Sequence, residues 1–179
     1  MINEQNTAAG SLLEQTAVSK YVWQIPNSYI ALDLETTGLN PKRDKMIEIG
    51  AVRVEDGAET GRFHTMLNPR RELEERITEL TGIRGDMLEN APDIVDILEE
   101  FLAFCGELPL LGHRIIFDYS FVKRAAVNQG LAFEKNGIDT LTLCRRFMPA
   151  EESKRLGAAC AFYGLAQESA HRALGDALD

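Results

Sequence analysis

Residues 28–69 contain three strand-like segments in succession, with no helix between them. The first is "SYIALDLE" (28–35), which ends in the turn residues of "TTGLNP". The second, "KMIEIGAVRVED" (45–56), alternates apolar and polar residues and stops at an Asp-Gly turn, and the third is "GRFHTMLNP" (61–69). Because consecutive strands joined by short turns pair antiparallel, the chain is predicted to open with a three-stranded meander.

After residue 69 the apolar residues change period, and helices alternate with strands. We expect a mixed five-stranded sheet of α/β type with helices packed on it. The final helix is expected to begin near His171, and it has no C-cap before Asp179, which suggests that it is truncated. The expected helices are 72–82, 91–106, 117–130, 153–165 and 171–179, and the expected strands 108–113 and 136–143.

The composition is that of one globular domain. Hydrophobic residues make up 45% of the chain and charged residues 26%, with no repeat or linker that divides it. We expect residues 1–27 to form a loosely ordered arm and residues 28–179 to form the domain. No apolar run approaches the ~20 residues of a membrane span, and the N-terminus lacks the features of a secretory signal. These features predict a cytoplasmic protein with no membrane partner.

Charge and cysteine content restrict the chemistry. The net charge of −9 excludes a positive field over the whole surface, and the acidic excess lies in residues 1–104. Contacts with a nucleic acid would therefore come from local basic groups, backbone N–H groups and bound metal. The cysteines Cys105, Cys144 and Cys160 are far apart and show no metal-site spacing, so we expect reduced core thiols.

Two carboxylates stand one residue apart in the first strand, Asp33 and Glu35. Residues i and i+2 of a strand share a face, with Cα atoms roughly 6.5 to 7 Å apart. Like charges this close raise each other's pKa unless a cation lies between them, and hard oxygen ligands suit Mg²⁺ or Mn²⁺. A strand end at which both acids are solvated would explain the pair equally well.

Three further residues bear on this choice. Asp118 follows the strand 108–113 and opens a helix, where an acid also serves as a cap. A strand in that position belongs beside the first strand, which would bring Asp118 to the mouth of the Asp33–Glu35 face. His171 and Asp176 stand five residues apart at the last helix; a lone histidine there is also common as a capping or surface residue.

Four segments together resemble one family. "ALDLETTGLNPKRDKMIEIGAV", "ITELTGIRGDML", "LLGHRIIFDYSF" and "HRALGDA" are similar to motifs of the DEDD exonuclease superfamily, His subclass. That family is typified by the epsilon proofreading subunit of bacterial DNA polymerase III and by exonuclease domains inserted in replicative polymerases. The resemblance implies a ribonuclease H-like fold and metal-dependent 3'–5' hydrolysis of single-stranded nucleic-acid ends, with the release of nucleoside monophosphates. DNA is the expected substrate.

The resemblance also implies roles for individual residues. Asp33, Glu35, Asp118 and Asp176 would bind two divalent cations, Mg²⁺ or Mn²⁺, and His171 would be the general base that activates water. Candidates for contacts with the terminal nucleotide are Thr36, Thr37, Thr81 and Ile83, with a turn role as the alternative for Thr37. The second motif departs from the family pattern because Arg114 stands where an asparagine is usual.

Several alternatives stay open from the sequence. The same family includes exoribonucleases that process RNA 3' ends, and nothing in the sequence separates a DNA substrate from RNA. A proofreading role would require a DNA polymerase subunit as a partner. "DLETT" is also close to the nucleophile motif of haloacid dehalogenase-like phosphatases, although those have parallel first strands. A module that only binds a polymerase or nucleic acid is the non-enzymatic alternative.

Overall fold

The computed structural model describes residues 26–166 and 171–179. The arm expected at residues 1–27 therefore lies almost entirely outside the described part. The strands are β1 (Tyr29–Thr36), β2 (Met46–Glu55), β3 (Ala58–Met66), β4 (Leu110–Gly112) and β5 (Gly137–Asp139). The helices are α1 (Glu75–Thr81), α2 (Gly85–Leu88), α3 (Ile94–Cys105), α4 (Ile116–Asn128), α5 (Thr140–Phe147), α6 (Leu156–Tyr163) and α7 (Ala173–Leu178).

The five strands form one mixed sheet in the order β3-β2-β1-β4-β5. β1, β2 and β3 pair antiparallel, as predicted. β4 pairs parallel with β1, and β5 pairs parallel with β4. The predicted α/β architecture is confirmed. The antiparallel pairing of β1 with β2 also rules out the parallel first strands that a haloacid dehalogenase-like phosphatase would need.

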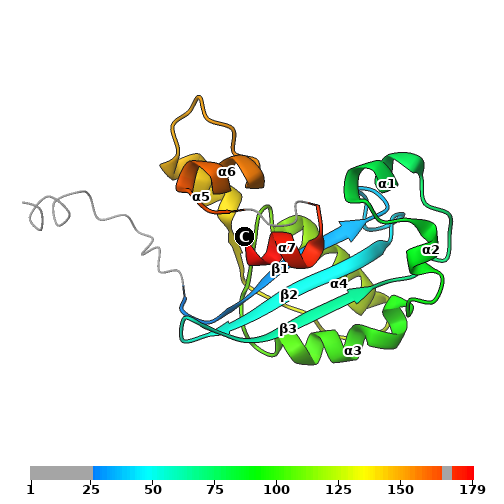
Figure 1. Cartoon of the computed structure of the whole chain (residues 1–179). Coiled ribbons are helices and arrows are strands. Elements are labelled where there is room, and N and C mark those ends of the chain that lie inside the picture. The colour runs from blue at the N-terminus through cyan, green and yellow to red at the C-terminus, as the bar shows by residue number, and fades with distance from the viewer. Residues whose placement is uncertain (1–25, 167–170) are drawn as a thin grey trace, which may run out of the picture.

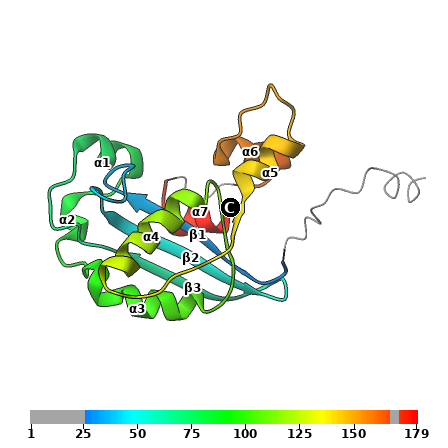
Figure 2. The same cartoon turned by 180° about the vertical axis from the view of Figure 1, so that it is seen from behind.

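Helices cover the two faces of the sheet unequally. α3 and α4 pack across one face, and the short helix α7 lies on the other, over β1 and β2 (Figures 1 and 2). The main core fills the space beneath α3 and α4, where Leu32 and Leu34 of β1 meet Phe101 of α3 and Phe121 of α4. Alternation along β1 therefore sends Asp33 and Glu35 to the face that carries α7.

The strand predicted at 136–143 is wrong in its second half. The strand β5 ends at Asp139, whose side chain accepts a hydrogen bond from Leu141 N and caps helix α5. This N-cap gives residues from Thr140 onward a helical start that outweighs the β-branched threonines. The last helix also begins later than predicted, at Ala173 rather than near His171.

Some boundaries move by a few residues, as in β3, which begins at Ala58, and α1, which begins at Glu75. The short helix α2 was not predicted. Within the described ranges, no helix combines the length and apolar character that a bilayer span requires.

Candidate active site

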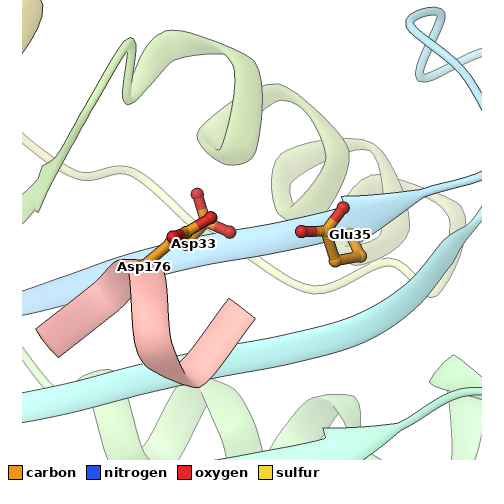
Figure 3. A group of neighbouring side chains, drawn as sticks. All are labelled: Asp33, Glu35 and Asp176. Atoms are coloured by element: carbon orange, nitrogen blue, oxygen red, sulfur yellow. The ribbon is translucent and has the colours of Figure 1, made fainter. Parts of the chain in front are cut away.

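Three carboxylates from two distant parts of the chain come together on the α7 face of the sheet. Asp33 and Glu35 project from β1, and Asp176 projects from α7 toward them (Figure 3). Each offers an oxygen that lies within 4.8 Å of the others'. All three side chains are partly buried. This is the one arrangement among the described residues in which at least three potential metal ligands converge.

Burial and mutual repulsion raise the pKa values of Asp33 and Glu35 in this group. Burial raises the pKa of Asp33 well above its ordinary value, and the charges of Asp118, Glu35 and Asp176 raise it further. The pKa of Glu35 is raised to about 7, chiefly by burial and also by the charges of Asp176 and Glu48, while Arg172 lowers it. A cation placed between these carboxylates would stabilise their ionised form. The donor set therefore fits a divalent metal ion, which prefers hard carboxylate oxygens.

Asp118 stands beside this group rather than inside it. Its side chain is buried, and its Oδ1 accepts a hydrogen bond from Leu34 N at 3.1 Å. The last pair between β1 and β4 is Ala31 with Leu111, so farther along β1 the Asp118 carboxylate replaces the missing strand partner. Burial raises the pKa of Asp118 to about 8, opposed by its backbone hydrogen bonds. The charge of Asp118 raises the pKa of Asp33, so Asp118 lies next to the three carboxylates, where the sequence placed it.

His171 lies at the entry to α7, two residues before the helix begins. Its backbone is in the left-handed region, with φ of 60°, and its side chain is exposed. The backbone N–H of His171 donates to Asp176 Oδ2 at 3.1 Å. The histidine is therefore linked to the carboxylate group through its backbone, and its imidazole is open to solvent.

The four residues predicted to contact substrate are largely engaged inside the protein. The Thr36 hydroxyl donates to Gly38 O at 2.6 Å. Thr37 is buried, and its hydroxyl accepts hydrogen bonds from Lys45 N and from Arg71.

The other two lie at the end of α1 and beyond it. Thr81 is buried and bonds to Ile77 O and Ile83 N, at 2.9 and 3.1 Å. Ile83 is fully buried in a cluster with Ile77 and Leu88. These positions show how the residues support the fold around the site; the predicted substrate contacts stay predictions.

Arg114 occupies a strained turn between β4 and α4. Its φ is 73°, its side chain is exposed, and its backbone N–H donates to Asp139 Oδ1 at 2.9 Å. Asp139 also accepts a hydrogen bond from Leu141 N, so its carboxylate ties the turn before α4 to the start of α5.

Glu48 is a buried acid that the sequence interpretation missed. It is fully inaccessible on β2, where its carboxylate bonds with Arg172 of the segment before α7 and lies 2.7 Å from His64 Nε2. It stood in the polar phase of an alternating strand, which is typical of a solvent-facing residue. The available signal in the sequence was its place within the otherwise apolar run "MIEIGAV". In the structure every residue of this run, from Met46 to Val52, is buried.

Comparison with known proteins agrees with the motifs. A family model described as Exonuclease (RNase T) matches residues 30–179. A DNA polymerase III of PolC type from Thermotoga petrophila is 40% identical over 151 residues, which are 84% of this chain and 11% of the polymerase. The chain thus spans about a tenth of the length of the curated relatives it matches.

Solved structures share the fold at lower identity. Exonuclease I of E. coli in complex with a dT13 oligonucleotide aligns with a TM-score of 0.72 and 16% identity, over 86% of this chain and 39% of that one. The nuclease domain of 3'hExo, a DEDDh family member bound to rAMP, aligns with a TM-score of 0.71 and 19% identity, over 87% and 88% of the chains. With the motifs, the family match and the shared architecture in agreement, the chain belongs to the DEDD exonuclease family.

Proposed function

We propose that this chain is a metal-dependent 3'–5' exonuclease that releases nucleoside monophosphates from single-stranded DNA ends. The observation that supports it most is the meeting of Asp33, Glu35 and Asp176 within 4.8 Å in a member of the exonuclease family. A relative that is 40% identical is a DNA polymerase III of PolC type, which favours DNA as the substrate. In that setting the domain would remove nucleotides for a polymerase partner.

The metal ions would be two Mg²⁺ or Mn²⁺, held by Asp33, Glu35 and Asp176 with Asp118 beside them. When bound, they supply the positive charge that stabilises a phosphodiester under attack by water. The chain's own part is to hold these carboxylates at short range on a rigid sheet. Asp118 contributes to that rigidity because it is tied to the backbone of β1 at Leu34.

His171 is the proposed general base. A neutral imidazole accepts a proton from water near neutral pH, and general-base groups of this kind contribute about 10²- to 10⁴-fold to rate. The exposure of the His171 ring leaves it accessible to water and to an incoming nucleic-acid end. Its backbone hydrogen bond to Asp176 keeps it next to the carboxylate group.

The nucleotide contacts are assigned by position. Thr36 ends β1 and Thr37 follows it, while Thr81 ends α1 and Ile83 lies two residues beyond. Because the hydroxyls of Thr37 and Thr81 are hydrogen-bonded inside the protein, we expect these two residues to shape the surface that receives the terminal nucleotide. A side-chain donor from either to the nucleic acid is not expected.

The experiment uses 5'-labelled single-stranded DNA and RNA of one sequence, with Mg²⁺, Mn²⁺ or a chelator. Wild-type protein should shorten the DNA stepwise from its 3' end in either metal, and the chelator should stop the reaction. Asp33→Ala should abolish cleavage, and His171→Ala should lower kcat about 10²- to 10⁴-fold.

Asp86→Ala is the matched control, because Asp86 is an exposed acid on α2 paired with Arg84. It should cleave at the wild-type rate. Equal activity in the Asp33→Ala protein, or undiminished activity in chelator, would contradict the mechanism. Faster cleavage of RNA than of DNA would reassign the substrate.

A further inference from the structure

α7 reaches the sheet at two residues of β2 that face the two carboxylates of β1. In the register between these strands, Asp33 lies opposite Gly50 and Glu35 lies opposite Glu48. Both β2 residues contact the start of α7. The helix that carries Asp176 is therefore held by the strand next to Asp33 and Glu35, directly beside them.

Gly50 provides the close approach. A Cβ atom at this position would lie 2.1 Å from the carbonyl carbon of Ala173 and 2.2 Å from Leu174 N. Neither of these backbone atoms is able to rotate away as a flexible side chain would. The first turn of α7 thus rests on the bare backbone of β2, and Ala173 is fully buried there.

Glu48 provides the polar attachment. Its Oε1 and Oε2 accept hydrogen bonds from Arg172 Nη2 at 2.9 Å and from Arg172 Nε at 3.3 and 3.2 Å. Its Oε2 also accepts the backbone N–H of Ala173 at 3.1 Å, and His64 Nε2 lies 2.7 Å from Oε1. A buried acid with this set of donors is fully satisfied inside the protein.

α7 has little stability of its own. It is six residues long, which is far below the length at which an isolated helix persists in water. It also brings a third negative charge to a pair of acids that already repel one another. Its position must therefore be fixed by contacts with the rest of the protein, and at its first turn these are the packing on Gly50 and the hydrogen bonds to Glu48.

We propose that Glu48 is a positioning residue of the exonuclease site, which acts through Arg172 and Ala173 to hold Asp176 and His171 in place over Asp33 and Glu35. This rests on the proposed function for its catalytic consequence. Glu48 itself does not touch substrate. The anchoring is a property of the fold that is measurable without activity.

The test compares Glu48→Gln, Arg172→Gln and the double variant. Glutamine keeps the shape of Glu48 and an acceptor for Ala173 N but loses the ion pair. We expect kcat to fall about tenfold and the Mn²⁺ concentration for half-maximal rate to rise about tenfold, as for other residues that orient metal ligands. KM for the oligonucleotide should stay within about twofold. The double variant should lose no more than the worse single variant.

A second readout is amide hydrogen exchange in the segment 172–179, with the strands as an internal reference. Exchange there should be faster in Glu48→Gln while β1 and β2 keep their protection. The matched control is Glu59→Gln, the same substitution at an exposed ion pair with Arg62 on the same sheet. It should change neither the kinetics nor exchange in α7.

The outcomes separate the inference from the proposed function. Unchanged kcat, metal requirement and exchange in Glu48→Gln would overturn the positioning role, and so would a lower Tm with normal kcat below that temperature. A wild-type protein without nuclease activity would overturn the proposed function alone. The exchange experiment would then still decide whether Glu48 anchors α7.

Discussion

Without metal, the protein should lose stability as the pH rises from about 5 to about 8. The reason is Glu35, whose pKa is raised from its ordinary value of 4.5 to about 7, first by burial and then by the charges of Asp176 and Glu48. At a pH between the ordinary pKa of 4.5 and the raised pKa of about 7, the Glu35 carboxyl keeps a proton in the folded state that it has released in the unfolded chain. By linkage, the free energy of unfolding then falls as the pH rises through that window, and it levels off above it.

The size of the effect follows from the same two values. Moving a carboxyl pKa from 4.5 to about 7 corresponds to about 3 kcal/mol once the group is ionised. A domain of this size changes Tm by roughly 2–4 °C per kcal/mol, so Glu35 alone should lower Tm by roughly 6–12 °C. A cation among the carboxylates offsets the repulsion. The increase in Tm on adding Mg²⁺ or Mn²⁺ should therefore be larger at pH 8 than at pH 5.

The assay is thermal unfolding of chelator-treated protein across this pH range, with and without added metal. Glu35→Gln removes the titrating group, so its metal-free Tm should fall less between pH 5 and pH 8 than that of the wild type. Glu59→Gln, at an exposed acid on β3, should behave as the wild type does. The reasoning fails if the metal-free wild type and Glu35→Gln show the same pH dependence, or if metal raises Tm equally at both ends of the range.

Three further predictions test other parts of the structure. Gly50→Ala should displace α7 through the 2.1 Å clash with Ala173 and lower kcat about 100-fold in the oligonucleotide assay, a loss that wild-type kinetics would contradict. Asp139→Ala should lower the free energy of unfolding by about 1 kcal/mol in urea titrations, because it removes the cap of α5; an unchanged midpoint would count against that role. Burial raises the pKa of the Cys105 thiol to about 12, so this thiol should resist alkylation at pH 8 until urea unfolds the protein. Mass spectrometry measures the labelling, and rapid labelling of the native protein would refute the burial of Cys105.

The parts of the fold that local patterns determine were predictable. Alternation and turn residues placed β1, β2 and β3, and the two-residue period of a strand put Asp33 and Glu35 on one face. Thr140 and Thr142 suggested that β5 would continue, because their branched side chains favour strands. The competing signal was Asp139 as an N-cap, which a reading of β propensity alone does not weigh.

The arrangement of the site depends on contacts between distant residues, and sequence patterns reveal these poorly. Arg172 and Glu48 are 124 residues apart, so no local period links them. Glu48 is a polar residue in the alternating pattern of β2, so the sequence indicated that it faces solvent. It is buried because α7 packs on the same face of the sheet. The order of the strands placed Asp118 near the carboxylates. Its hydrogen bond with Leu34 N joins residues 84 positions apart, and no local pattern predicts such a bond.

The carboxylate group and the Glu48–Arg172 pair are therefore coupled through α7. Metal between the carboxylates would attract Asp176 toward β1, and the Glu48–Arg172 pair holds the start of the same helix. Any ligand that binds the docked position of α7 more tightly than an undocked one must also favour docking. Strengthening the anchor at Glu48 should then raise metal affinity, and bound metal should protect α7. Since Arg172 also lowers the pKa of Glu35, the residue that fixes the helix reduces the repulsion that opposes its docking.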